Sequence, residues 1–309
     1  MQTPLLITVC ALLTSTALAA PGTPIAGTGL LYSGPGTATA VTNIDAVRDL
    51  LTNAPAGGLA TVPFETVLIM VSNANAGNVK FSPANKADNG TYAFMIDGTP
   101  GTLDVDCGQA KGTGLVPYLY VNGRPRKIMF KGMSVVGKIV VNNTGDATGV
   151  QIQNISKRTK RTEHARLPGV LYEPGRIHSV ITTGKLKRLQ SNHGGFGGAS
   201  AADPGVIAVG EASPDGQLKA NPKGRVSFVL VCRQLAPPND YDYAGAYRAC
   251  LASNTVLPRV VMGNLKMLNA KAIGPAVIGA TFVKPIPASQ IGKRVKLTNP
   301  VVGQTNLVQ

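Results

Sequence analysis

The sequence predicts a mainly β protein with one short N-terminal helix and one long basic, glycine-rich loop. Its 36 glycines and 22 prolines make up about 19% of the 309 residues, where roughly 12% is usual. Charged residues are only 15% of the chain, compared with a usual value of about 25%. This composition favours short strands joined by turns, because glycine and proline interrupt long helices.

The first residues have the layout of a secretory signal peptide. They carry no charged side chain, and an apolar run over residues 5–13 is followed by the small residues Ala17, Ala19 and Ala20. Residues 1–19 are therefore predicted to be removed, with cleavage after Ala19 or Ala20. Export would place the protein outside the cell or at the cell surface.

The chain is strongly basic for so few charges. It has 30 Lys and Arg residues and 15 Asp and Glu residues, a formal net charge of +15. Such a protein is attracted to anionic polymers or surfaces, and the attraction weakens as salt rises. No later segment reaches the roughly 18 uninterrupted apolar residues of a membrane helix, so no membrane span is expected.

The helix is predicted within residues 42–58, "TNIDAVRDLLTNAPAGG". Apolar residues recur there at helical spacing, Thr42 is placed to cap the start, and Pro55 interrupts the pattern at its far end. A short amphipathic helix of this kind is expected to lie over a sheet.

Strand signals begin near Thr66 with "TVLIMVSN", which is followed by the turn sequence "NANAGN". Farther along, "YLYVNGRPRKIMFKG" places Asn122 and Gly123 between two strand-like segments. Both residues tolerate the positive φ of a type I′ turn, so a hairpin is predicted. Pro125 has no N–H to donate, which indicates an edge position in that hairpin.

The stretch "GKIVVNNTGDATGVQIQN", residues 137–154, has a strand, a turn and a valine-led alternating strand. It resembles the immunoglobulin-like repeat modules of microbial surface proteins. "VLIMVSNANAGNVKF", residues 67–81, repeats the scheme about 70 residues earlier. The resemblance implies immunoglobulin-like or related β-sandwich units, and a generic β-hairpin is the alternative.

Two β-rich domains are predicted, over residues 20–156 and 206–309. The second contains "GRVSFVLVCRQL", whose alternation indicates a central strand. Residues 157–205 are predicted to be a basic, glycine-rich linker between the domains. One large sandwich that carries this basic segment as a long insertion is the alternative.

The basic segment is the predicted binding surface. Between Lys157 and Gly194 the chain has nine basic and two acidic residues. An acidic polysaccharide, a nucleic acid or an anionic cell envelope would release counterions on binding, so affinity should fall steeply with salt. The hypothesised anion-binding residues are Lys157, Arg158, Lys160, Arg161, Arg166, Lys185, Lys187 and Arg188.

Two other interpretations of this segment stay open. It is an ordinary solvated loop in one of them. In the other, "RTKR" and "KLKR" are cleavage sites, since "RTKR" is similar to the substrates of subtilisin-like secretory convertases, and mature fragments would begin at Thr162 or Leu189. Base stacking has little support, because only Tyr172 and Phe196 accompany the charge and the chain has no tryptophan.

All three histidines, His164, His178 and His193, lie in the same segment as Glu163 and Glu173. A secreted hydrolase or nuclease that uses these residues is the rival hypothesis. The histidines are 14 and 15 residues apart, which matches no metal-ligand motif, and no Walker loop, dinucleotide fingerprint or paired-cysteine zinc spacing occurs. We therefore expect a non-enzymatic protein without cofactor or metal.

Three cysteines remain once Cys10 leaves with the signal peptide. A disulfide is predicted between Cys232 and Cys250, and closing a loop of this size stabilises the fold by about 3 kcal/mol. Cys107 is then either buried or available for self-association with another chain.

Asn89, Asn142 and Asn154 stand in the glycosylation sequons "NGT", "NNT" and "NIS". They are predicted to lie in surface turns, and to be modified if the source organism glycosylates exported proteins.

Overall fold

The computed structural model of the chain describes residues 22–85, 90–106, 114–132, 134–156, 165–167, 170–172, 175–191, 206–209, 227–235, 259–261, 264–273 and 295–297. These residues form one short helix, two large β-sheets and a small two-stranded sheet. The predicted mainly β fold with one short N-terminal helix is therefore confirmed. No helix in these ranges is both long enough and apolar enough to cross a membrane.

The ten-stranded sheet is termed sheet A, and the eight-stranded sheet is termed sheet B. In spatial order, sheet A consists of β1 (Thr23–Pro24), β2 (Leu30–Ser33), β5 (Asn78–Pro83), β7 (Thr102–Asp106), β9 (Lys127–Lys131), β11 (Val150–Asn154), β15 (Leu186–Ser191), β17 (Ser227–Leu235), β19 (Asn264–Ile273) and β20 (Val295–Leu297). Sheet B consists of β18 (Arg259–Val261), β16 (Val206–Val209), β14 (Ile177–Thr182), β10 (Val135–Asn142), β8 (Leu115–Asn122), β6 (Tyr92–Asp97), β4 (Val67–Ser72) and β3 (Thr37–Val41). The small sheet pairs β12 (Ala165–Leu167) with β13 (Val170–Tyr172).

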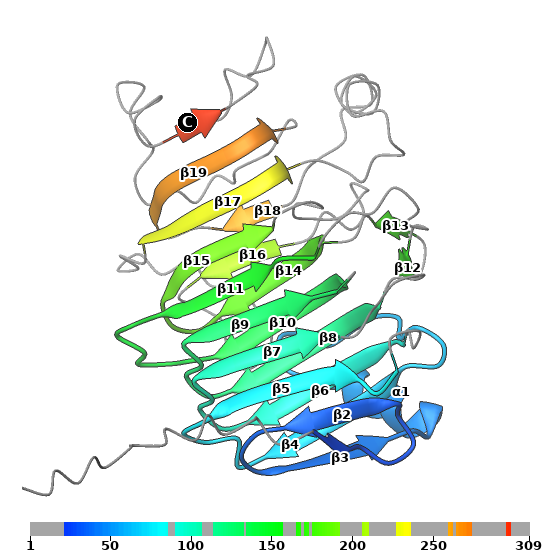
Figure 1. Ribbon diagram of the computed structural model, residues 1–309. Helices are drawn as coiled ribbons and strands as arrows, with labels where there is room; N and C mark the ends of the chain where they lie inside the picture. The colour runs from blue at the N-terminus through cyan, green and yellow to red at the C-terminus, as the bar shows by residue number, and fades with distance from the viewer. Residues whose placement is uncertain are drawn as a thin grey trace, which may run out of the picture.

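The chain coils between the two sheets. From β4 to β11, consecutive strands alternate between sheet B and sheet A, and each strand pairs in parallel with the strand one coil away. β14 to β19 continue the same alternation. Figure 1 shows the strands of both sheets stacked one above another along the length of the molecule. The architecture is a parallel β-solenoid, in which each coil contacts only its neighbours.

The core lies between the sheets and consists of stacked apolar side chains. In sheet B, Ile69, Phe94, Leu119, Ile139 and Val180 follow one another in register and are fully buried. Adjacent strands lie about 4.8 Å apart, so each side chain packs against the equivalent side chain of the next coil. The residue numbers give coil lengths of 25, 25, 20 and 41 residues, and the longest coil includes β12 and β13.

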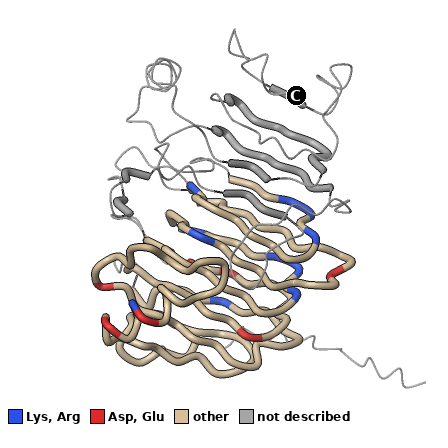
Figure 2. Tube along the Cα trace, turned by 180° about the vertical axis from the view of Figure 1, so that it is seen from behind, with Lys and Arg blue, Asp and Glu red and all other residues tan. Residues whose placement is uncertain are grey.

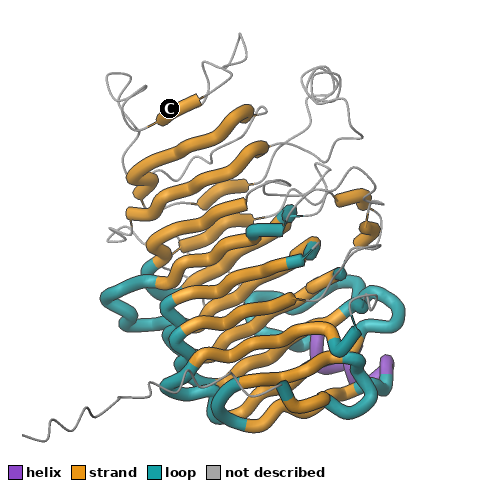
Figure 3. Tube along the Cα trace, viewed as in Figure 1, coloured by secondary structure: helices purple, strands orange, loops and turns teal. Residues whose placement is uncertain are grey.

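The N-terminal end differs from the rest, because β1, β2 and β3 pair antiparallel. The helix α1 (Ile44–Thr52) follows β3 and buries Val47 and Leu51 against the outer face of sheet B (Figure 3). The Asn43 side chain accepts hydrogen bonds from the backbone N–H groups of Asp45 and Ala46, at 3.0 and 3.1 Å. The helix cap is therefore Asn43, one residue after the predicted Thr42.

The immunoglobulin-like arrangement is not confirmed. Immunoglobulin-like sandwiches consist of antiparallel sheets, whereas the sheets of this protein are mainly parallel. The two segments that resemble each other, residues 67–81 and 137–154, are β4–β5 and β10–β11. They are the same part of the coil, three coils apart.

The predicted hairpin at Asn122 and Gly123 is wrong. β8 pairs with β6 and β10, and β9 pairs with β7 and β11, so the turn is a corner between the sheets. Gly123 does not have the positive φ of a type I′ turn. It is required for a close approach instead, since a Cβ atom there would lie 1.8 Å from the carbonyl oxygen of Gly98.

Part of the predicted linker belongs to the solenoid. Ile177–Thr182 and Leu186–Ser191 form β14 and β15, which extend sheet B and sheet A. The division into two β-rich domains, over residues 20–156 and 206–309, stays a prediction. Cys232 lies in β17, whereas Cys107 and Cys250 lie outside the described residues, so the disulfide and the self-association through Cys107 also stay predictions.

Candidate anion-binding site

Basic side chains gather at one edge of the solenoid, where the chain passes from sheet B into sheet A. They come from the β8–β9 corner, the β14–β15 corner and the first residues of β9 and β15. Figure 2 shows Lys and Arg positions following one another along this side of the stack. These residues, termed the basic edge, are Arg124, Arg126, Lys127, Lys185, Lys187 and Arg188.

Parallel pairing brings the two halves of the basic edge together. Gln151 of β11 is in register with Lys127 of β9 on one side and with Arg188 of β15 on the other. Two strand spacings separate these cations, so their backbones lie about 10 Å apart although 60 residues separate them in the sequence. The solenoid thus aligns two basic clusters that are distant along the chain.

The basic edge is open to solvent. Arg124, Arg126, Lys185 and Lys187 are exposed, and the other two residues are half-buried. Arg188 Nε donates to Gln190 Oε1 at 2.9 Å, and Lys185 Nζ donates to the carbonyl oxygen of Ala147 at 3.2 Å. Within the described part of the chain, the salt bridges are Arg48–Asp45 and Lys131–Asp104, so no carboxylate there neutralises the basic edge.

Asp146 is a carboxylate in the β10–β11 corner, in the coil between the two halves of the basic edge. Its side chain accepts hydrogen bonds from the backbone N–H of Thr148 at 2.9 Å and from the Thr148 hydroxyl at 2.8 Å. Burial raises the pKa of Asp146, but these bonds, the Gly149 N–H and the Asn143 amide together lower it below its usual value. The carboxylate is therefore engaged in shaping its own turn.

The structure places three of the predicted anion-binding residues, Lys185, Lys187 and Arg188, in the basic edge. Arg166 lies in β12, opposite Leu171 of β13. Four others lie outside the described residues: Lys157, Arg158, Lys160 and Arg161.

Sequence reasoning missed Arg124, Arg126 and Lys127. The signal was present, because "RPRK" has three basic residues in four positions. The hairpin that this stretch predicts gives no reason to place it beside Lys185.

The structure also bears on the cleavage alternative. Lys187 and Arg188 lie inside β15, which pairs with β11 and with β17. A convertase binds its substrate as a free extended segment, so this strand would have to leave the sheet before cleavage. The other predicted cleavage site, residues 158–161, lies outside the described residues.

Of the residues in the rival enzyme hypothesis, only His178 is described. It lies in β14, and its Nδ1 is 2.8 Å from the hydroxyl oxygen of the adjacent Ser179. Among the described residues no group of three His, Cys, Asp or Glu side chains could hold a metal ion. The other residues of that hypothesis lie outside the described residues: His164, His193, Glu163 and Glu173.

The predicted glycosylation sites differ in exposure. Asn142 is half-buried at the end of β10, and its Nδ2 donates to Asn122 Oδ1 at 2.9 Å. Asn154 is fully buried, with its Nδ2 3.1 Å from the carbonyl oxygen of Ser134, so a glycan cannot be attached there in the folded protein. Asn89 lies outside the described residues.

Comparisons of the chain with known protein families, with curated proteins and with solved structures find no match. The functional argument therefore depends on the geometry of the basic edge.

Proposed function

We propose that this protein is exported and works at an extracellular or cell-envelope surface as a non-enzymatic binding protein that engages an acidic polysaccharide through its basic edge. The observation that carries the proposal is the register that joins Lys127, Gln151 and Arg188 across three neighbouring strands. It brings two clusters of cations, one on each side of Gln151, onto the same edge, and none of these cations has a carboxylate partner among the described residues.

The shape and chemistry of the basic edge favour a single linear polyanion. The clusters at the starts of β9 and β15 lie on the same edge, with the uncharged Gln151 between them, so one extended chain can contact both clusters at once. The neighbouring outward side chains, Gln151, Gln153 and Met129, offer no aromatic ring for base stacking. An acidic polysaccharide needs only charge contacts and hydrogen bonds, and Lys and Arg supply both.

Retention on immobilised heparin, measured as the salt concentration at elution, tests this proposal. Replacing all six residues of the basic edge with glutamine should bring elution close to the void volume and weaken binding at least 100-fold at moderate salt, because each lost contact removes a counterion-release contribution. Arg126→Gln alone should elute earlier and lower the slope of log K against log salt by roughly 1, because one counterion fewer is released.

Arg48→Gln is the matched control, since it also removes one arginine charge but from α1, where Arg48 pairs with Asp45. It should elute with the wild type. Equal shifts for Arg126→Gln and Arg48→Gln would mean that net charge alone drives retention, and the proposed site would be wrong.

Stronger binding to single-stranded DNA than to heparin would mean that the ligand is a nucleic acid and not a polysaccharide. The variant with Lys157, Arg158, Lys160 and Arg161 changed to alanine shows whether those residues extend the site.

Export has its own test. The protein should be recovered from the medium or the cell envelope of its source cell. Its intact mass should correspond to a chain that begins at Ala20 or Pro21, as expected for signal-peptide cleavage. Recovery of the uncleaved chain from the cytosol would contradict the extracellular role while leaving polyanion binding in vitro unaffected.

A further inference from the structure

The outer face of sheet B has rows of side chains that run across the strands. The first row, which includes Leu68, Ala93 and Tyr118, is buried beneath α1 and the loop that follows it. The Tyr118 hydroxyl donates to the carbonyl oxygen of Pro55 at 2.8 Å, which fastens this loop to the sheet. The helix and loop therefore cover one side of the face and leave the rest open.

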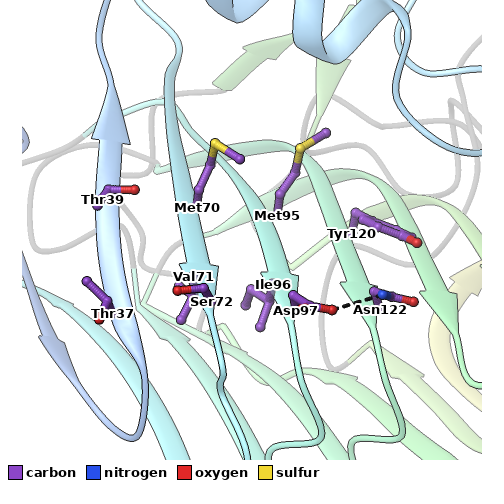
Figure 4. A pocket seen from close by; sticks show the side chains of 10 residues that line it. All are labelled: Thr37, Thr39, Met70, Val71, Ser72, Met95, Ile96, Asp97, Tyr120 and Asn122. Atoms are coloured by element: carbon purple, nitrogen blue, oxygen red, sulfur yellow. Dashed lines mark hydrogen bonds between the residues drawn. The ribbon is translucent and has the colours of Figure 1, made fainter.

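Two further rows line an open groove of about 530 Å³ beside the covered area. To these rows each of β4, β6 and β8 contributes one apolar and one polar side chain, while Val71 and Ile96, which also line the groove, are buried in the core. Figure 4 shows the apolar row, Met70, Met95 and Tyr120, next to the polar row, Ser72, Asp97 and Asn122. The edge strand β3 adds Thr37 and Thr39.

Hydrogen bonds orient Asp97 and Asn122 of the polar row. Asn122 Nδ2 donates to Asp97 Oδ1 at 2.9 Å, and Asn142 Nδ2 donates to Asn122 Oδ1 at 2.9 Å. An amide nitrogen has two protons and each oxygen has two lone pairs, so these side chains keep further donors and acceptors for a ligand. The row presents both kinds of group at the spacing of the strands, about 4.8 Å.

The apolar row forms a mainly apolar surface that carries one polar group, the Tyr120 hydroxyl. Met70 is 37% exposed, although it is a large apolar side chain, and Tyr120 is half-buried with its ring beside the groove. Burial raises the pKa of the Tyr120 phenol more than its hydrogen bond with Asn142 lowers it, so the hydroxyl keeps its proton at neutral pH. A tyrosine of this kind offers a flat apolar ring and one hydrogen-bonding group.

The charge of the groove selects against anions. No Lys or Arg lines it, and Asp97 is its one charged lining residue. This sets the groove apart from the basic edge, which begins only two residues after Asn122, at Arg124. A ligand of this groove should therefore carry no negative charge, and should have an apolar face beside a row of hydrogen-bonding groups.

We propose that this groove binds a neutral polysaccharide chain that lies across β3, β4, β6 and β8. A sugar ring has a face of C–H groups, which suits Met70, Met95 and Tyr120, and an edge of hydroxyls, which suits Asp97 and Asn122. Because both rows repeat from strand to strand, successive sugar units meet the same pair of surfaces. The site is separate from the basic edge, so the protein would join a neutral and an acidic polysaccharide.

Methionine methyl NMR tests the groove directly. The full chain, labelled with [methyl-13C]methionine, is titrated with neutral hexasaccharides of glucose, mannose, xylose and N-acetylglucosamine. At least one of them should shift the Met70 and Met95 methyl signals in a saturable way, with a dissociation constant in the millimolar range or tighter. Met129, on the outer face of sheet A, should not shift and is the internal control.

Two variants distinguish a binding role of Tyr120 from a structural one. Tyr120→Leu keeps an apolar side chain but removes the ring, and should weaken binding about tenfold. Tyr120→Phe keeps the ring and should lose threefold or less. Phe64→Ala, which removes an aromatic ring that is 75% exposed and lies outside the groove, should leave affinity unchanged. Tyr120→Leu should also leave heparin elution unchanged, so this proposal and the basic edge fail independently.

Three results would overturn the proposal. One is that no neutral hexasaccharide shifts Met70 or Met95. Another is that an acidic oligosaccharide shifts them at lower concentration than every neutral one, which would make the groove part of the basic edge. The third is that the signals move with protein concentration in the absence of sugar while sedimentation shows a dimer, since a second copy of the chain would then be the occupant.

Discussion

Gly123→Ala is expected to disrupt the coil that presents the basic edge and to lower the melting temperature by roughly 10 °C or more. The added Cβ would lie 1.8 Å from the carbonyl oxygen of Gly98 and 2.5 Å from its carbonyl carbon. Both are backbone atoms, so no side-chain rotation can make room. The backbone must therefore move. Two hydrogen bonds oppose that movement, from Gly98 N to Asn122 O and from Gly123 N to Asn142 O.

Function should fail together with this corner. Arg124, Arg126 and Lys127 follow Gly123 directly, and their alignment with Arg188 depends on the register of β9 with β11. Gly123→Ala should therefore elute from heparin at lower salt than the wild type even though it keeps every basic residue. Thermal unfolding by circular dichroism and heparin elution measure the two effects on one sample.

Gly101→Ala is the matched control. It makes the same chemical change in the preceding coil, but its nearest new neighbours would be the side-chain ends of Asn78 and Arg126, at 3.2 and 3.3 Å. Both can rotate away, so stability should change by less than about 1 kcal/mol. If Gly123→Ala melts no lower than Gly101→Ala, the corner does not have the close approach that the structure describes.

The sequence predicted strands and turns correctly here but not how the strands pair. A strand, a tight turn and another strand carry the same local pattern in a hairpin and in a corner between two sheets. The difference depends on whether β8 bonds to β9 or to β6 and β10, which lie about one coil away along the chain. Local periodicity has no information about such distant partners.

The internal repeat could have supplied that information, but it is weak. The inward positions Ile69, Phe94, Leu119 and Ile139 share only apolar character, and the spacing changes from 25 to 20 residues. Only the 70-residue likeness between residues 67–81 and 137–154 was visible, and it spans three coils. A repeat of this kind indicates a solenoid once its period is recognised.

Only half of the basic edge could be predicted from the sequence, again because the pairing of distant strands is not visible in local patterns. Lys185, Lys187 and Arg188 stood out because neighbouring residues are also basic, and charge density along the chain is easy to see. Arg124, Arg126 and Lys127 join them only through pairing across Gln151. The groove on sheet B had no sequence signal at all, because its two rows combine residues that lie about 25 positions apart.

Asn154→Ala is expected to destabilise the solenoid by about 2 kcal/mol, which lowers the melting temperature by roughly 4–8 °C. Asn154 is fully buried between coils. Its Nδ2 donates to the carbonyl oxygens of Ser134 and Arg176, at 3.1 and 3.5 Å, and its Oδ1 accepts from Ser156 N at 3.1 Å. Alanine would leave Ser156 N without this partner where water does not reach, and such a group costs about 1–3 kcal/mol. The two carbonyl oxygens would lose their second hydrogen bond but keep those from Gly175 N and Val136 N, both at 2.9 Å.

Gln153→Ala separates this effect from the general cost of shortening a polar side chain in β11. Gln153 faces outward, is half-buried and bonds only to the Gln190 side chain among the described residues, at 3.3 Å, so its loss should cost less than about 1 kcal/mol. Denaturant midpoints of the two variants give the comparison. Equal midpoints, or a glycan found on Asn154 of folded exported protein, would show that the Asn154 side chain reaches solvent. The hydrogen bonds that join β11 to the residues before β10 and β14 would then be absent, and with them a polar contact between two neighbouring coils.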